Sequence, residues 1–193
     1  MEKRDTRLAI IEAALEIFAQ KGYEKATVDE IAAGANIAKG TVFYNFKSKE
    51  DIFFAIIEKG THDFAELVRE RSALGKTPSE KLELAYDSAF EFFLKYNNYC
   101  TLLISEIWRV RTRWNYEPTH LLDQYKESMV SIFSEGQQSG EFRRDIEPKD
   151  IGLIVFFLAA VSSLSKALSG EANIEQKLFD RTRLILMKGV SAD

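Results

Sequence analysis

Apolar residues recur at helical spacing along most of the chain. Between Leu8 and Phe18 they stand three or four positions apart, with charged residues among them, and Gly22 follows. This pattern predicts an amphipathic helix that ends at Gly22. No segment alternates apolar and polar residues as a strand does, and no internal repeat is present. We therefore expect an all-α fold of about nine or ten helices.

Two short helices joined by a turn are predicted next. Thr27 and Glu30 stand three positions apart, as in a capping box, and the first helix runs to about residue 34 or 35. Asn36 follows, a residue type that tolerates the left-handed conformation of a tight turn. The second helix runs from about residue 38 to about residue 44. The predicted core of this helix-turn-helix consists of Ile31, Ala32, Ile37, Val42 and Phe46.

Capping residues mark the helices of the remaining chain. Ser48 begins a helix that runs to about residue 72. A break at residues 73–76 precedes Thr77, Pro78 and Glu80, which predict a helix start with a capping box and Pro at the first position. We expect a helix-turn-helix domain over residues 1–47 and a second helical domain over residues 48–193, connected by the helix 48–72.

The last part of the chain contains four further predicted helices. Residues 99–111 and 118–138 have the spacing of amphipathic helices. Residues 148–168 are apolar nearly all round, which indicates a helix buried on several sides, whereas residues 173–190 are again amphipathic. The run 151–164 is too short to span a bilayer, and no signal peptide is visible, so we expect a cytoplasmic protein without a membrane segment.

The net charge of −4 excludes a globally basic nucleic-acid binder. However, no Asp or Glu occurs from Gly34 to Lys49. The cationic residues that lie in this window or in the N-terminal arm are Lys3, Arg4, Arg7, Lys39, Lys47 and Lys49. This distribution predicts a local positive face at the helix-turn-helix, which projects its second helix toward the DNA major groove.

The segments 27–32 and 37–50, with Ile10 to Leu15, Phe18 and Gly22 upstream, resemble the DNA-binding region of tetracycline-repressor-type (TetR-family) regulators. This resemblance implies a dimeric regulator that binds double-stranded operator DNA. We expect a repressor that binds a palindromic operator and is released by a small effector, either an acyl-coenzyme A or a drug-like compound. The residues to which it assigns DNA contacts are Thr27, Lys39, Gly40, Thr41, Phe43, Tyr44, Asn45 and Lys49.

The implied contacts differ in kind. Thr27 and Lys49 would bind phosphates, and Gly40 would let the helix approach the groove. Asn45 is able to make a bidentate contact to adenine if its geometry allows. Phe43 stands where the family often has tyrosine, so it lacks the hydroxyl that would reach a phosphate. Ala38 replaces a frequent serine or threonine, and the second short helix therefore lacks a side-chain cap.

We expect a homodimer through helices 148–168 and 173–190, although the first could instead be a central core helix. The resemblance also implies a small-molecule effector, apolar or amphipathic, in the aromatic body, where single aromatic residues are more often core. The candidate pocket residues are Phe64, Phe90, Phe93, Trp108, Arg109, Tyr125, Met129, Phe133 and Phe156. Arg109, Arg111 and Arg113 could clamp the phosphate of an acyl-coenzyme A, or simply favour a helix C-terminus and face solvent.

The sequence gives little support for a catalytic or metal-binding site. His62 and His120 have no Cys or His at metal-ligand spacing, and there is no glycine-rich phosphate loop. The single cysteine, Cys100, is expected to be a buried small hydrophobe. We predict no metal, no cofactor and no enzymatic activity. The alternatives are a small-molecule carrier that uses the apolar body without binding DNA and, more remotely, a helical enzyme that uses Glu106 and His120.

Overall fold

The computed structural model describes residues 3–102, 122–169 and 174–192. These residues are helical apart from turns and one isolated bridge between Phe142 and Ser191, which confirms the all-α prediction. The chain divides into two compact units, unit 1 (residues 1–61 and 98–121) and unit 2 (residues 62–97 and 122–193). The division falls inside helix α4, whereas the predicted domain boundary at 47/48 corresponds to the start of that helix.

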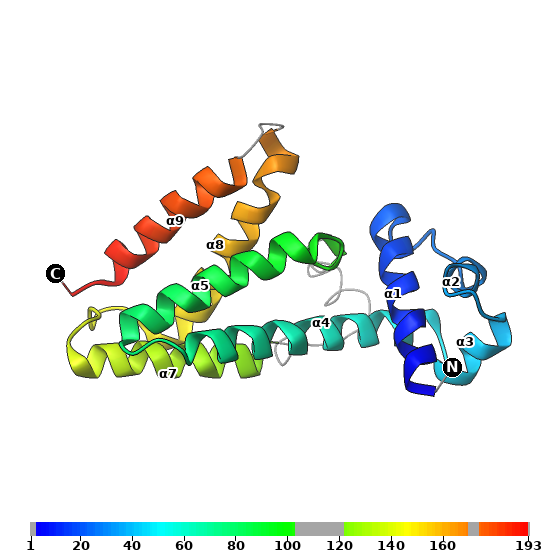
Figure 1. The fold of residues 1–193 in the computed structure, drawn as a ribbon, viewed down its shortest axis with the longest axis horizontal. Coiled ribbons are helices and arrows are strands. Elements are labelled where there is room, and N and C mark those ends of the chain that lie inside the picture. Colours follow the sequence, from blue (N-terminus) through cyan, green and yellow to red (C-terminus); the bar gives the residue numbers. More distant parts are fainter. Residues whose placement is uncertain (1–2, 103–121, 170–173, 193) are drawn as a thin grey trace. The chain divides into compact units, whose positions relative to one another are not determined.

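Unit 1 contains the predicted helix-turn-helix. Its helices are α1 (Lys3–Lys21), α2 (Val28–Gly34), α3 (Lys39–Asn45) and the first half of α4 (Lys49–Ser72) (Figure 1). Gly22 ends α1 with φ of 79°, and Asn36 has φ of 53° in the turn between α2 and α3. Both positions have the left-handed backbone that their residue types favour. The sequence prediction of these boundaries is confirmed to within a residue or two.

The core of unit 1 combines aliphatic residues with aromatic rings. Tyr23 lies between Phe18 and Phe53, with ring centroids 5.3 Å from each. Gly34 allows α2 to approach α1, because a Cβ built at this glycine would lie 3.3 Å from the Cβ of Ala13. Four of the five predicted core residues are buried, and the fifth, Ile37, is half-buried: the buried four are Ile31, Ala32, Val42 and Phe46.

A tyrosine ring lies directly on the backbone of α4 within unit 1. A Cβ built at Gly60 would meet the Cε2 atom of Tyr99 at 2.1 Å. The Tyr99 hydroxyl donates a hydrogen bond to the carbonyl of Ile57 at 3.4 Å, and the Thr61 hydroxyl donates to the same carbonyl at 2.8 Å. Cys100 is buried next to this tyrosine, and burial raises the pKa of its thiol. The prediction of an inert buried cysteine is thereby supported.

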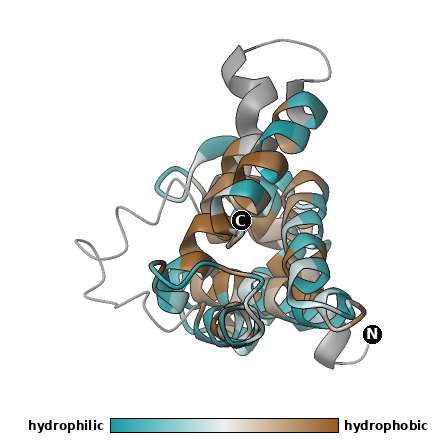
Figure 2. Ribbon diagram, turned by 90° about the vertical axis from the view of Figure 1, so that its left-hand side faces the viewer, coloured by the Kyte–Doolittle hydropathy of each residue, from teal (hydrophilic) through white to brown (hydrophobic). Residues whose placement is uncertain are grey.

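Unit 2 is built from the second half of α4 and four further helices. These are α5 (Pro78–Lys95), α7 (Asp123–Ser139), α8 (Pro148–Ser169) and α9 (Ile174–Val190). In Figure 2 hydrophobic and hydrophilic segments lie side by side along the helices, as expected for helices that pack one face inward. Residues 97–102 are helical, but most of the predicted helix 99–111 and the predicted start at Pro118 lie outside the described residues.

The start of α5 differs from the predicted capping box. Thr77 is the N-cap, and its hydroxyl accepts a hydrogen bond from the backbone N–H of Glu80 at 3.1 Å. The Glu80 carboxylate, however, accepts from the backbone N–H of Lys76 at 2.7 Å, not from that of Thr77. The glutamate therefore reaches one residue further back than the sequence pattern predicted.

An aromatic cluster forms the centre of unit 2. Phe64 of α4 lies 4.8 Å from Tyr125, 5.2 Å from Phe92 and 5.5 Å from Phe93 and Phe156, measured between ring centroids. The buried hydroxyl of Tyr125 donates to the carbonyl of Gly152 at 2.9 Å, so the polar end of this ring is satisfied. Its pKa is raised by burial, and the group stays protonated.

Helix α9 is attached to α5 by stacked rings and a charged bridge. Phe179 stacks on Phe90, with ring centroids 4.3 Å apart. Arg183 donates to Asp87 at 2.9 Å and to Glu83 at 3.0 Å. Burial of the Asp87 carboxyl raises its pKa, although the hydrogen bond from Arg183 acts in the opposite direction. None of the helices in the described part of the chain is long and apolar enough to cross a membrane.

Candidate DNA-binding site

Helix α2 begins with the reciprocal capping box that the sequence predicted. The Thr27 hydroxyl accepts from the backbone N–H of Glu30 at 3.3 Å, and the Glu30 carboxylate accepts from the backbone N–H of Thr27 at 3.0 Å. Hydrogen bonding from Lys21, followed by that from Thr27, lowers the pKa of the Glu30 carboxyl. The Thr27 backbone N–H is thus bonded to the Glu30 carboxylate, and the phosphate contact of Thr27 stays a prediction.

The turn before α3 is held by backbone hydrogen bonds. The N–H of Ile37 donates to the carbonyl of Ala32 at 3.0 Å, and Asn36 donates to Ala33 at 3.1 Å. Ala38 is the N-cap of α3 and makes no side-chain capping bond, as its residue type predicted. The orientation of α3 therefore depends on the turn before it and on contacts at its other end.

Helix α3 exposes a surface of mixed chemistry. Tyr44 is 74% exposed and Phe43 is 49% exposed. A Cβ built at Gly40 would meet no atom of the protein within 4 Å, and the backbone there is helical. The protein's own packing therefore gives no reason for a glycine, whereas close approach of a DNA backbone does.

Asn45 is less available for base contacts than its position suggested. Its side-chain amide nitrogen donates to the carbonyl of Thr41 at 2.8 Å, one turn earlier in α3. Its own backbone carbonyl accepts from Arg7 at 2.9 Å. A bidentate contact to adenine needs one amide N–H and the amide oxygen together, so it would have to use the second N–H of this group. The predicted contact stays a prediction.

The acid-free window of the sequence does not exclude acids in space. Lys39 forms an ion pair with Asp29 of α2 at 2.9 Å, and Asp51 accepts from the backbone N–H of Lys47 at 3.0 Å. Neither contact is visible in the sequence pattern, because these carboxylates come from neighbouring helices. The ion pair between Lys39 and Asp29 is exposed, so a phosphate can compete for Lys39 at a small energetic cost.

Lys49 makes internal contacts in the unbound protein. Its ammonium donates to the backbone carbonyls of Tyr23 at 2.8 Å, Ala26 at 2.9 Å and Glu24 at 3.3 Å. It also lies 4.4 Å from the centre of the Tyr23 ring. Desolvation lowers the pKa of Lys49. The lysine thus holds the loop between α1 and α2, and its predicted phosphate contact stays a prediction.

Arg7 contacts the far end of α3. It donates through Nη1 to the Asn45 carbonyl, and its guanidinium carbon lies 4.0 Å from the centre of the Phe46 ring. With these residues, Arg7 lines a groove of about 350 Å³ in unit 1. The sequence had suggested only that Arg7 contributes positive charge. Because 38 positions separate Arg7 from Asn45, the local sequence pattern contains no signal for this contact.

The candidate pocket residues that the structure describes belong to more than one group of contacts. Phe64, Phe93, Tyr125 and Phe156 meet in the aromatic cluster of unit 2, next to which Met129 is also buried. The remaining described candidates make separate contacts: Phe90 stacks on Phe179, and Phe133 stacks on Phe142 with centroids 4.9 Å apart. Trp108 and Arg109, together with Arg111 and Arg113, lie outside the described residues.

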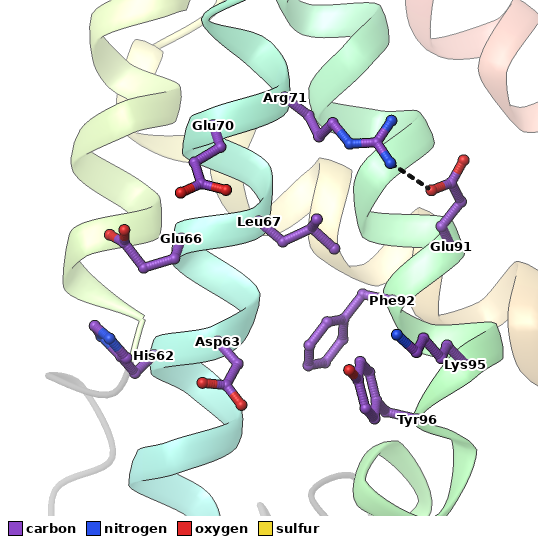
Figure 3. Close-up of a pocket in the computed structure, with 10 residues that line it drawn as sticks. All are labelled: His62, Asp63, Glu66, Leu67, Glu70, Arg71, Glu91, Phe92, Lys95 and Tyr96. Atoms are coloured by element: carbon purple, nitrogen blue, oxygen red, sulfur yellow. Dashed lines mark ion pairs between the residues drawn. The ribbon is translucent and has the colours of Figure 1, made fainter.

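A second concavity lies between residues of α4 and α5 in unit 2. This groove of about 420 Å³ is bordered mainly by charged side chains, and Figure 3 shows Glu66, Glu70 and Glu91 along it. Phe92 and Tyr96 form an aromatic part of its wall. Among the described residues, no cluster of His, Cys, Asp and Glu side chains is suited to hold a metal ion. None of the predicted pocket residues within the described part of the chain lines this groove.

Comparison with known families identifies both halves of the chain. Residues 10–56 match the family of bacterial regulatory proteins called tetR, and residues 75–165 match the tetracyclin repressor-like C-terminal domain. The fatty acid metabolism regulator protein of Bacillus subtilis is 28% identical over 155 residues, which is 80% of each chain. QacR of Staphylococcus aureus is 25% identical over 94% of this chain and 96% of its own length.

Solved structures agree with these matches. A candidate fatty acid metabolism regulator of Clostridium perfringens is 32% identical and superposes with a TM-score of 0.81. The alignment covers 96% of this chain and 100% of the other. FadR of Bacillus subtilis in complex with stearoyl-CoA is 24% identical and shows the same fold with a TM-score of 0.76. The alignment covers 95% of this chain and 98% of that structure's chain. The chain therefore belongs to the TetR family of bacterial transcription regulators, which bind DNA and are not enzymes.

Proposed function

We propose that this regulator is a homodimeric repressor that binds a palindromic operator and is released by an amphipathic effector, an acyl-coenzyme A thioester. The proposal places the protein with the chromosome in the cytoplasm. Its DNA-binding element is α3, and the observation that carries it is the exposed surface of this helix. Gly40 leaves open space there, and Phe43 and Tyr44 expose aromatic rings, a combination suited to close approach of a groove.

A row of exposed apolar side chains supports the homodimer. On α8 these residues recur along one stripe, and α9 adds two more; they are Leu153, Ile154, Phe157, Val161, Leu184 and Ile185. A contiguous apolar surface of this kind marks a protein interface. A two-fold pair would present two copies of α3 to two half-sites of a palindrome. The stripe lies on α8 and α9, the two helices through which the sequence predicted a dimer.

The effector class rests on the relatives. One is a fatty acid metabolism regulator, and a structure of the same fold contains stearoyl-CoA. The buried cluster around Phe64 has the apolar character that an acyl chain requires. Its side chains fill the centre of unit 2, so an acyl chain would have to displace some of these rings. The arginines expected to bind the thioester's phosphates are Arg109, Arg111 and Arg113.

The operator proposal is tested by selection of genomic fragments on the purified protein. We expect enrichment of a palindromic site that binds with steep salt dependence and saturates at one dimer per site. Enrichment without any shared sequence, or saturation by one monomer, would contradict the proposal. The Tyr44→Ala variant is the matched control for specific binding because Tyr44 is 74% exposed on α3.

The effector proposal is tested on the selected DNA by fluorescence anisotropy. Stearoyl-CoA is expected to release the protein at micromolar concentration, whereas coenzyme A alone and free stearate are not. Release by a cationic drug-like compound but not by stearoyl-CoA would contradict the effector class and leave operator binding intact. The carrier alternative would be favoured by tight lipid binding with no sequence-specific DNA binding, but it gives no role to the exposed surface of α3.

A further inference from the structure

We infer that Arg7 of α1 is a positioning residue for the recognition helix α3, and that its contribution to operator binding is orientation rather than charge. The inference deepens the proposed operator binding and rests on it, but it does not depend on the effector. It assigns a specific role to Arg7, which the sequence alone shows only as one of several cations of the N-terminal arm.

Helix α3 cannot hold its own direction. It has seven residues, and isolated helices of this length are unstable because nucleation is costly. Its N-cap, Ala38, makes no side-chain hydrogen bond. At its C-terminal end the N–H of Phe46 donates to the carbonyl of Val42 at 2.9 Å, and the carbonyl of Asn45 accepts from a donor outside the helix. Contacts at this end, together with the turn before α3 and the buried Val42, therefore fix where Phe43 and Tyr44 point.

Arg7 makes two such contacts at once. Its Nη1 donates to the carbonyl of Asn45, the last residue of α3, at 2.9 Å. Its guanidinium carbon lies 4.0 Å from the ring centre of Phe46, which is the C-cap and is 3% exposed. A cation at a helix C-terminus is favourable. A guanidinium presents several N–H donors in one fixed plane, whereas the ammonium of lysine is a compact point charge on a flexible stem, so lysine is not an equivalent residue here.

The surroundings of Arg7 argue against a phosphate contact in the same place. The groove that Arg7 lines also contains the carboxylates of Asp51 and Glu58. A phosphate that entered this groove to reach Arg7 would meet both negative charges. Lys47 lines the same groove, and its side chain is exposed. It provides a matched cation whose contribution can be compared with that of Arg7.

The experiment compares three variants on the selected operator over a range of salt concentrations. Arg7→Lys keeps the charge without the planar group, Arg7→Met removes the charge, and Lys47→Met removes a neighbouring charge. Measured quantities are the operator dissociation constant, its salt dependence, and the preference for the operator over single-base variants. Because this preference is a ratio of two affinities, a change in the folded fraction alone does not alter it. Hydrogen exchange of the α3 amides and the thermal midpoint accompany the binding data.

We expect Arg7→Lys and Arg7→Met to weaken operator binding alike, by about tenfold, as for loss of a charged hydrogen bond. Both should reduce base preference and speed exchange in α3, with the salt slope unchanged. Lys47→Met should lower the slope by about one with base preference retained. Wild-type affinity in Arg7→Lys together with a reduced slope in Arg7→Met would overturn the inference. Failure of the wild-type protein to select any operator would instead contradict the proposed function.

Discussion

Two phenylalanines are equally exposed in this protein, and their neighbours distinguish their roles. Phe43 on α3 and Phe157 on α8 each have 49% of their surface accessible to solvent. Phe43 lies on a short helix with Gly40 and Tyr44, near lysines of the same segment. Phe157 belongs to an apolar stripe with Leu153 and Val161 on a helix of 22 residues. Exposure alone therefore does not assign a partner, and the surrounding chemistry distinguishes the two surfaces.

The difference has a physical basis. A DNA groove and its phosphates favour sparse aromatic rings among polar and cationic groups, because much of the interface remains wet. A second protein copy favours continuous apolar surface, since its gain comes from the area removed from water. The two helices are therefore expected to respond in opposite ways to the same kinds of substitution.

The largest effect should come from Phe157→Glu. A carboxylate placed in the apolar stripe would be buried unpaired in the dimer, so the dimer dissociation constant should rise by about a hundredfold or more. Analytical ultracentrifugation over a concentration series measures it. Leu94→Glu, at another exposed apolar position of unit 2 that is 44% accessible, is the matched control and should leave the dimer intact. Persistence of the dimer in Phe157→Glu would remove the contrast between α8 and α3.

Tyr44→Ala should give the next largest effect, on DNA alone. Loss of its exposed ring should weaken operator binding by about tenfold, the range for a single specific contact. The dimer dissociation constant and the thermal midpoint should stay close to those of the wild type. Fluorescence anisotropy and sedimentation test this in one preparation. A change in dimerisation with unchanged DNA affinity would reverse the assignment of the two surfaces.

A smaller effect of opposite sign is expected from Phe43→Tyr. The added hydroxyl can donate to a phosphate, and one such hydrogen bond is worth about 0.5–1.5 kcal/mol, so operator binding should tighten by about two- to tenfold. Phe157→Tyr adds the same hydroxyl on α8 and should leave operator affinity unchanged. If Phe43→Tyr binds no more tightly than wild type, the ring of residue 43 does not reach a phosphate.

The smallest of the predicted effects is the change in stability on Gly40→Ala. Alanine is favoured over glycine within a helix by about 0.5–1 kcal/mol, and the space around Gly40 is open. Calorimetry should therefore show a slightly raised thermal midpoint, while operator affinity falls because the methyl group crowds the DNA. An unchanged affinity would show that α3 does not approach the DNA backbone at this residue.

Local signals explain what the sequence predicted well. The capping box of Thr27, the left-handed Asn36 and the glycine after α1 depend on neighbours a few positions away, so the pattern of residues determines them. The exposed apolar stripe of α8 was visible as excess hydrophobicity. These features were sufficient for the fold class, the helix boundaries and the DNA-binding element.

Long-range contacts were beyond that kind of prediction. Arg7 bonds Asn45, and Lys49 bonds the carbonyls of Tyr23 and Ala26. Two cations of the predicted positive face, one of which the resemblance assigned to a phosphate, therefore also support the protein itself. Likewise, the residues proposed as one pocket separate into the cluster around Phe64 and distinct ring pairs. Helical periodicity shows that a residue faces inward, but it does not show which other inward-facing residues it meets.

The tyrosine that lies on Gly60 has a consequence for spectroscopy. With the Tyr99 ring against the backbone of α4, the α-protons of Gly60 lie in the ring-current field of the aromatic system. Their NMR resonances should therefore be displaced from ordinary glycine positions, without any label having been introduced. A movement of the ring away from α4 would return them to those positions. Gly60 thus provides an intrinsic reporter by which the response of this helix to DNA or to an effector can be followed in solution.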